Sequence, residues 1–93
     1  MLVGISEILI YLPNCHSLKD KRSIIQRIKA LMRKKYNISI AEIGNKDSWK
    51  ESKIGISCVS DSRKVIDRVM NKIMNDIDQN SDVQLIDYQI TVN

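Results

Sequence analysis

Basic residues are concentrated in one short segment of the sequence, where they could bind a polyanion. Eight of the 15 Lys and Arg residues lie at positions 19–35 beside one acid, Asp20, so this segment carries a formal charge of +7 and the rest of the chain −3. Clustered ammonium and guanidinium groups attract phosphate groups. The pattern therefore favours a polyanionic partner, although a solvated helix face has the same composition.

The spacing of these residues predicts a stripe along one side of a helix. At 100° per residue the stripe is about 21 Å long, and its members are Lys19, Arg22, Gln26, Lys29 and Arg33. Repulsion between like charges one turn apart costs only about 0.2–0.5 kcal/mol per pair. We therefore predict a nucleic-acid-binding surface made of Lys19, Lys21, Arg22, Lys29 and Arg33.

Lys21 differs from the other four because its helical angle falls inside the apolar stripe of Ile24, Ile25 and Ile28. A buried ammonium without a partner is costly, and a cation near a helix start opposes the helix dipole. Two interpretations stay open. Lys21 has a functional role at the helix entrance, or its stem packs on the core edge while its head reaches solvent.

Other reactive side chains lack the spacing that catalysis or metal binding requires. Cys15 and His16 adjoin, but no second pair of ligands and no orienting acid accompanies them. Cys58 is expected to be a small core residue. Glu7 and Glu42 are expected on exposed strand positions or in ion pairs with a nearby Lys. We therefore expect no enzymatic activity, metal or cofactor.

Trp49, the only Trp, lies in a polar connection near Asp47. Such a ring is either a lid over the core edge or a stacking surface for a base or a partner. Binding of RNA on sheet aromatics, as in RNA-recognition motifs, is disfavoured because Phe is absent. A possible partner surface is predicted from Glu42, Asp47, Trp49 and Tyr11.

Hydrophobic periodicity predicts six elements: strands at 2–12, 37–43, 53–60 and 82–92, a helix at 18–35, and a second helix starting after Ser60 or Asp61. Ser17 is the expected N-cap of the first helix, with Asp20 in a capping box, and Asn37 its left-handed C-terminal cap. The order predicts an α+β, ferredoxin-like βαββαβ sandwich: one domain, residues 1–93, with a four-stranded antiparallel sheet and two helices on one face. The first and third strands are expected to be central.

The exposed face of that sheet offers an alternative function. The odd-numbered residues Val3, Ile5, Leu9 and Tyr11 predict an apolar patch on it, and such a patch often marks an interface. A homodimer through the sheet is therefore the second interpretation. No membrane span is expected, because the apolar stretch 2–13 is short and contains Glu7. Two cysteines and no signal peptide pattern indicate a reduced, cytoplasmic protein.

Four segments in this order resemble the YlxP-like family of small bacterial proteins of unknown function. They are Pro13-x-Cys15-x-Ser17-Leu18-Lys19-x-Lys21-Arg22, Asn37-Ile-Ser-Ile-Ala41-Glu42, Asp47-x-Trp49 and Val59-Ser60. The resemblance covers nearly the whole chain. It implies a ferredoxin-like fold and no established enzymatic activity. Genes of such proteins often lie beside those of translation-initiation and ribosome-maturation factors, which implies an RNA or ribosome partner. We therefore expect a non-enzymatic, RNA- or ribosome-associated module that uses the basic helix.

Overall fold

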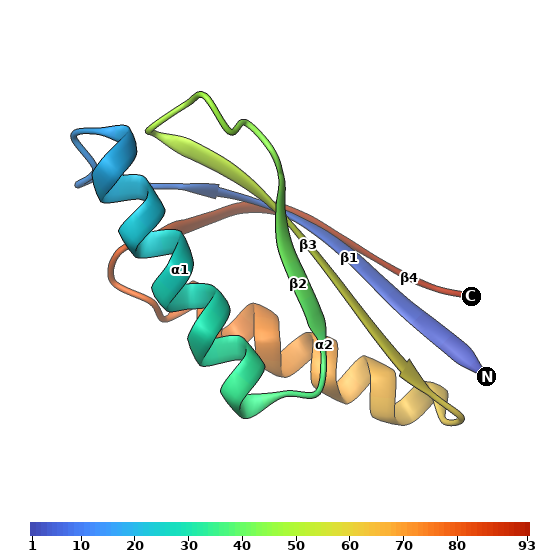
Figure 1. Cartoon of the computed structure of the whole chain (residues 1–93). Helices are drawn as coiled ribbons and strands as arrows, with labels where there is room; N and C mark the ends of the chain where they lie inside the picture. The colour runs from blue at the N-terminus through green and yellow to red at the C-terminus, as the bar shows by residue number, and fades with distance from the viewer.

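The computed structural model describes all 93 residues, which form six elements in the order predicted from the sequence (Figure 1). They are β1 (Leu2–Tyr11), α1 (Leu18–Lys35), β2 (Ser39–Gly44), β3 (Glu51–Ser60), α2 (Arg63–Asp78) and β4 (Gln84–Val92). The sheet is antiparallel, with the strand order β2-β3-β1-β4. The ferredoxin-like prediction is confirmed, including the central positions of β1 and β3.

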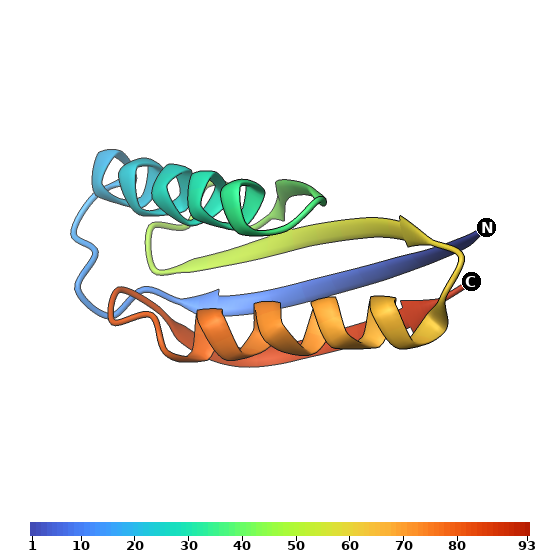
Figure 2. The same ribbon diagram turned by 90° about the horizontal axis from the view of Figure 1, so that it is seen from below.

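Both helices cover the same face of the sheet and leave the other face bare (Figure 2). α1 packs along β2, and α2 packs across β1, β3 and β4. Alternation in β1 explains this layering, because its even-numbered side chains, such as Ile8 and Ile10, are buried and its odd-numbered ones, such as Ile5 and Glu7, are exposed. Neither helix is long and apolar enough to cross a membrane.

Gly4 allows α2 to approach β1 closely. A Cβ atom at this position would collide with Cγ2 of Ile66 and lie 3.1 Å from Cε of Met70. The sulfur of Cys58 would lie 3.2 Å away on the neighbouring strand. Cys58 is buried there as the predicted core residue, and burial raises the pKa of its thiol.

The helix ends differ in detail from the sequence predictions. Ser17 caps α1 as expected, since its Oγ accepts from the N–H of Asp20 (3.1 Å). Asp20 accepts in turn from the N–H of His16 (3.3 Å), one residue before the N-cap. α2 is capped by Ser62, whose Oγ accepts from the N–H of Val65 (3.4 Å), and not by Ser60 or Asp61.

The predicted left-handed cap at Asn37 is also wrong. α1 ends at Tyr36 in an extended conformation (φ −134°), because the chain continues almost directly into β2. The one non-glycine residue with positive φ is Asn45 (59°), which begins the connection between β2 and β3. The tight reversal of the chain is therefore in that loop, eight residues after the predicted position.

Candidate functional site

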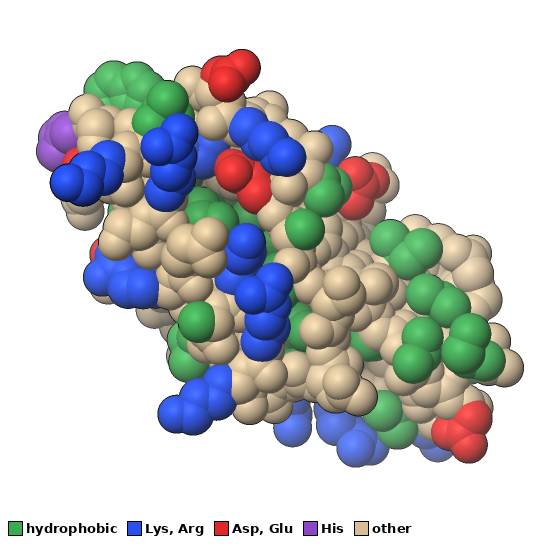
Figure 3. All heavy atoms as spheres, in the orientation of Figure 1, with side chains coloured by type: hydrophobic (Ala, Val, Ile, Leu, Met, Phe, Trp, Pro, Cys, Tyr) green, Lys and Arg blue, Asp and Glu red, His purple; other side chains and the backbone are tan.

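Four of the five predicted phosphate-binding residues lie on the outside of α1. Lys19, Arg22 and Arg33 are exposed and Lys29 is half-buried. None of the four lies within 4.0 Å of a carboxylate oxygen. We call these residues the α1 basic surface. Figure 3 shows Lys and Arg side chains gathered over α1 and its edge with β2, with few Asp or Glu side chains among them.

Other cations of α1 that face neighbouring elements are paired with carboxylates, which distinguishes Lys21, Arg27 and Lys35 from the α1 basic surface. At the end of α1, Asp76 of α2 accepts from Nζ of Lys35 (2.8 Å) and from the hydroxyl of Tyr36 (2.6 Å). The hydrogen bonds from Lys35 and Tyr36 lower the pKa of Asp76. Arg27 pairs with Asp82 at 3.5 Å. These ion pairs tie α1 to the second half of the chain.

Lys21 does not belong to the α1 basic surface, because its side chain is only 2% exposed. Its Nζ donates to the carbonyl oxygens of Asn45 (2.6 Å) and Ser48 and lies 2.9 Å from Oε2 of Glu42. An ammonium has three N–H donors, and these acceptors occupy all of them. The prediction that Lys21 contacts phosphate is therefore corrected, and its head does not reach solvent either.

Glu42 is the more exposed member of this pair, at 21% against 2% for Lys21, but its carboxylate is engaged and is not a free partner surface. Its Oε2 also accepts from Oγ of the buried Ser52 (2.6 Å). Burial by itself raises the pKa of Glu42, but the hydrogen bonds from Ser52 and Lys21 and the charge of Lys21 outweigh it, so the pKa is below its ordinary value. The sequence contained a signal for this pair: Lys21 in an apolar stripe needs an acid, and Glu42 lies on the strand that follows.

The loop between β2 and β3, residues 45–50, is hydrogen-bonded to Lys21 through the carbonyl oxygens of Asn45 and Ser48. The Oγ of Ser48 accepts from the backbone N–H groups of Lys50 (3.3 Å) and Glu51 (3.1 Å). The carbonyl of Lys50 accepts from the N–H of Leu12 (2.7 Å). This loop carries the exposed residues Asp47 and Trp49 of the predicted partner surface.

Tyr11, the remaining member of that partner surface, is half-buried on the bare face of the sheet, opposite Glu51 of β3 and Gln84 of β4. The structure therefore separates the four residues: Glu42 turns inward to Lys21, Asp47 and Trp49 lie on the loop, and Tyr11 lies on the sheet.

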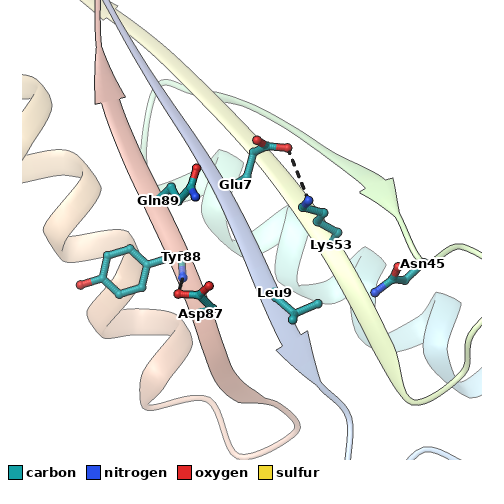
Figure 4. A pocket seen from close by; sticks show the side chains of 7 residues that line it. All are labelled: Glu7, Leu9, Asn45, Lys53, Asp87, Tyr88 and Gln89. Atoms are coloured by element: carbon teal, nitrogen blue, oxygen red, sulfur yellow. Dashed lines mark hydrogen bonds and ion pairs between the residues drawn. The ribbon is translucent and has the colours of Figure 1, made fainter.

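The bare face also contains a shallow hollow of about 290 Å³ (Figure 4). Polar side chains surround Leu9 there, and Nζ of Lys53 lies 3.9 Å from Oε1 of Glu7. Its lining is Glu7, Leu9, Asn45, Lys53, Asp87, Tyr88 and Gln89. The centre of the face is therefore charged and polar, and the apolar patch predicted there is interrupted.

Cys15 and His16, which adjoin in the sequence before α1, differ in their burial. Cys15 is fully buried, and its Sγ donates to the carbonyl of Ser17 (3.2 Å), whereas His16 is exposed. No group of three or more His, Cys, Asp or Glu side chains is placed to hold a metal ion.

Comparison with known proteins gives a family and a fold. The family described as "Protein of unknown function (DUF503)" matches residues 3–90. "Uncharacterized protein YlxP" of Bacillus subtilis (strain 168) is 31% identical over 83 residues, which are 89% of this chain and 90% of the relative. The solved structure of "De novo designed protein Foldit4" superposes with a TM-score of 0.56 at 14% identity, over 100% of this chain and 97% of the design. That likeness concerns the fold alone.

Replacing Lys21 tests whether its buried ammonium holds the loop to α1. We expect Lys21→Met to lower the free energy of unfolding by about 3 kcal/mol, the lower end of the cost of leaving one charge of a buried pair uncompensated, because Glu42 keeps 21% of its side chain exposed. Urea unfolding followed by circular dichroism measures the change. Lys19→Met removes an exposed cation from the same helix and is expected to stay within about 0.5 kcal/mol of the wild type. Equal stability of the two variants would contradict this role.

The lowered pKa of Glu42 predicts a pH dependence of stability. A carboxyl whose pKa is lower in the folded than in the unfolded state stabilises the fold above the unfolded pKa, and this contribution is lost as the pH falls through the folded pKa. We expect Glu42→Gln to flatten the loss of stability as the pH falls through and below the ordinary value of 4.5. Asp76, whose pKa is also lowered, leaves a residual slope in both proteins. Glu7→Gln, on the bare face, is the matched control, and identical curves for Glu42→Gln and wild type would contradict the assignment.

Proposed function

Since the chain belongs to the DUF503 family of proteins of unknown function, we propose a function from its own geometry: it is a non-enzymatic module that binds the phosphate groups of a structured RNA through the α1 basic surface. One observation supports this proposal above all. The four cations of this surface share one side of α1 and have no carboxylate within 4.0 Å, whereas Lys21, Arg27 and Lys35 of the same helix are paired with acids of other elements. Arg33 also donates to the carbonyl of Ile40 in β2 (3.2 Å), which leaves its charge unneutralised.

The shape of α1 favours a phosphate backbone as the ligand. Lys19 and Arg33 are 14 residues apart, or about 21 Å of helix, so that several phosphates can be contacted at once. Lys is a compact point charge, and Arg can hold two phosphate oxygens through its planar guanidinium. The apolar stripe of α1 packs on the sheet, so that helix does not offer a membrane the apolar face that insertion requires.

The uneven distribution of charge along the chain adds an orienting effect. Residues outside 19–35 carry a formal charge of −3 against +7 within that segment. Three acids of the remainder, Glu42, Asp76 and Asp82, pair with Lys21, Lys35 and Arg27, so the net positive charge that is left belongs to α1. Such an uneven distribution of charge steers the association of a polyanion. The expected ribosomal partner makes ribosomal RNA the first probe.

The salt dependence of RNA binding tests this proposal. Four phosphate contacts predict a slope of about −3 to −4 in a plot of log affinity against log salt concentration. We expect Arg22→Glu with Arg33→Glu to lower the affinity at least about tenfold and to reduce the slope by about 2. The matched control, Arg63→Glu with Arg68→Glu on α2, changes the net charge equally. A flat slope, or the same loss in both double variants, would contradict binding by α1.

Self-association through the bare face of the sheet is a second candidate function. The observation that favours it is an exposed apolar group where β1 begins and β3 ends: Val59 is 61% exposed and Ile5 is 41% exposed. Val59 lies opposite Val3 in the register of the two strands. Figure 3 shows hydrophobic side chains gathered at this end of the molecule, where both termini lie. This surface and the α1 basic surface are on different faces, so the two functions are compatible.

The mass of the protein in solution tests this second function. We expect light scattering to give a mass that rises with concentration towards that of two chains, and Val59→Asp to return it to one, because a charge in an apolar interface is left unpaired. Val65→Asp, at an exposed apolar position of α2, is the control. A constant mass of one chain at the highest concentration would contradict self-association.

A further inference from the structure

Trp49 is a large aromatic ring that the fold leaves 41% exposed in a firmly anchored loop. We propose that it is a stacking site for an unpaired base of the RNA whose phosphates bind the α1 basic surface. This inference rests on the proposed function and adds the element of RNA that the protein recognises, an unpaired base. The faces of all four bases are aromatic, so the site accepts any base.

The loop is anchored on both sides of Trp49. The carbonyl of Ser48, one residue before it, accepts from Nζ of Lys21. The carbonyl of Lys50, one residue after it, accepts from the N–H of Leu12 (2.7 Å). Nζ of Lys50 donates to the carbonyl of Pro13 (3.2 Å). A loop held in this way loses little backbone freedom when a base stacks on its aromatic ring, which favours binding.

The position of the ring connects it to the α1 basic surface. Lys21 bonds directly to the loop, and Lys19 and Arg22 flank it in the sequence of α1. Figures 1 and 2 show the β2–β3 loop beside the first turns of α1, at the end of the molecule away from the termini. An RNA strand that follows the cations towards the start of α1 therefore arrives at Trp49.

Cations accompany the ring itself. Nζ of Lys50 lies 5.0 Å from the centroid of the Trp49 ring, a cation–π distance. Lys46 is an exposed residue of the same loop, and its charge contributes to lowering the pKa of Glu42. Because Lys50 lies over one face of the ring, a base would stack on the other face. An aromatic ring with cations in the same loop is a combination that single-stranded nucleic acid binds, with the base on the ring and its phosphates on the cations.

The alternative interpretation of Trp49 as a lid over the core edge makes a different prediction. A lid contributes to stability, and its removal weakens the fold without acting on one class of RNA in particular. A stacking site discriminates between unpaired and paired bases, because a base inside a duplex has no free face. The comparison of two RNA probes therefore separates the two roles.

The single Trp makes the test direct, since all Trp fluorescence comes from this ring. The probes are an RNA hairpin with an unpaired loop and a fully paired duplex with the same number of phosphates. We expect the hairpin to quench the fluorescence, and Trp49→Leu to weaken hairpin binding about 5- to 100-fold. Trp49→Tyr is expected to retain most of the affinity, and neither variant is expected to change the salt slope, which reports phosphate contacts.

The outcomes separate this inference from the proposed function. Salt-dependent binding of the hairpin without quenching, or with equal affinity for Trp49→Leu, overturns the stacking site and leaves phosphate binding by α1 intact. Absence of salt-dependent binding to both probes overturns both. Circular dichroism of Trp49→Leu controls for folding, and if that variant fails to fold, quenching in the wild type and the affinity of Trp49→Tyr decide the question.

Discussion

The buried ammonium of Lys21 is the constraint on which the organisation of one end of the molecule depends. A charge at 2% exposure needs acceptors on every side, and here they come from two other parts of the chain: the carboxylate of Glu42 in β2 and the carbonyls of Asn45 and Ser48 in the loop. α1, β2 and the loop can satisfy this one group only in a single relative position. An apolar side chain at the same place would tolerate many relative positions of these elements, because packing is not directional. Replacement of buried ion pairs by apolar residues is often neutral or stabilising elsewhere, so we regard this pair as a device of specificity.

The irregular backbone around this pair follows from the same requirement. β2 shifts its register against β3 between Glu42 and Gly44, and Asn45 then adopts a left-handed conformation (φ 59°). Bulges commonly re-aim a side chain at the end of a strand. Here the irregularity lies immediately after the carboxylate that faces Lys21, and the reversal that follows turns two carbonyls towards the same ammonium. The four cations of the α1 basic surface have no carboxylate partner and lie on the outside of the same helix.

The sequence predicted regular structure better than it predicted contacts. The bounds of α1 were predicted at 18–35 because its apolar residues recur at helical spacing over five turns, and this period depends on no distant residue. The cap of α2 was misplaced by one or two residues because Ser60, Asp61 and Ser62 are all suitable cap residues, and the position of the helix on the sheet decides among them. Asn37 has the chemistry of a left-handed cap, but the short path into β2 requires an extended exit.

In the candidate site, too, local patterns were predicted from the sequence and contacts between distant residues were not. The stripe of Lys19, Arg22, Lys29 and Arg33 was predicted because exposure on a helix follows from angle alone. Lys21 was singled out as an anomaly from that angle, but its partners are 21 to 27 positions away in the sequence and no local pattern connects them. The exposure of Trp49 depends on how its loop folds back on Lys21 and Leu12, which a polar composition does not specify.

The place of β1 in the sheet has a consequence for how the chain is made. Both of its partners, β3 and β4, come from the second half of the sequence, and the backbone groups of Val3 finally pair with those of Asn93. On a ribosome β1 emerges before both of its partner strands, with an apolar face and two open edges, and it has no strand to pair with until β3 has followed. Such distant pairing slows folding. Until β3 and β4 have been made, the apolar face and the unpaired backbone edges of β1 are therefore open to aggregation.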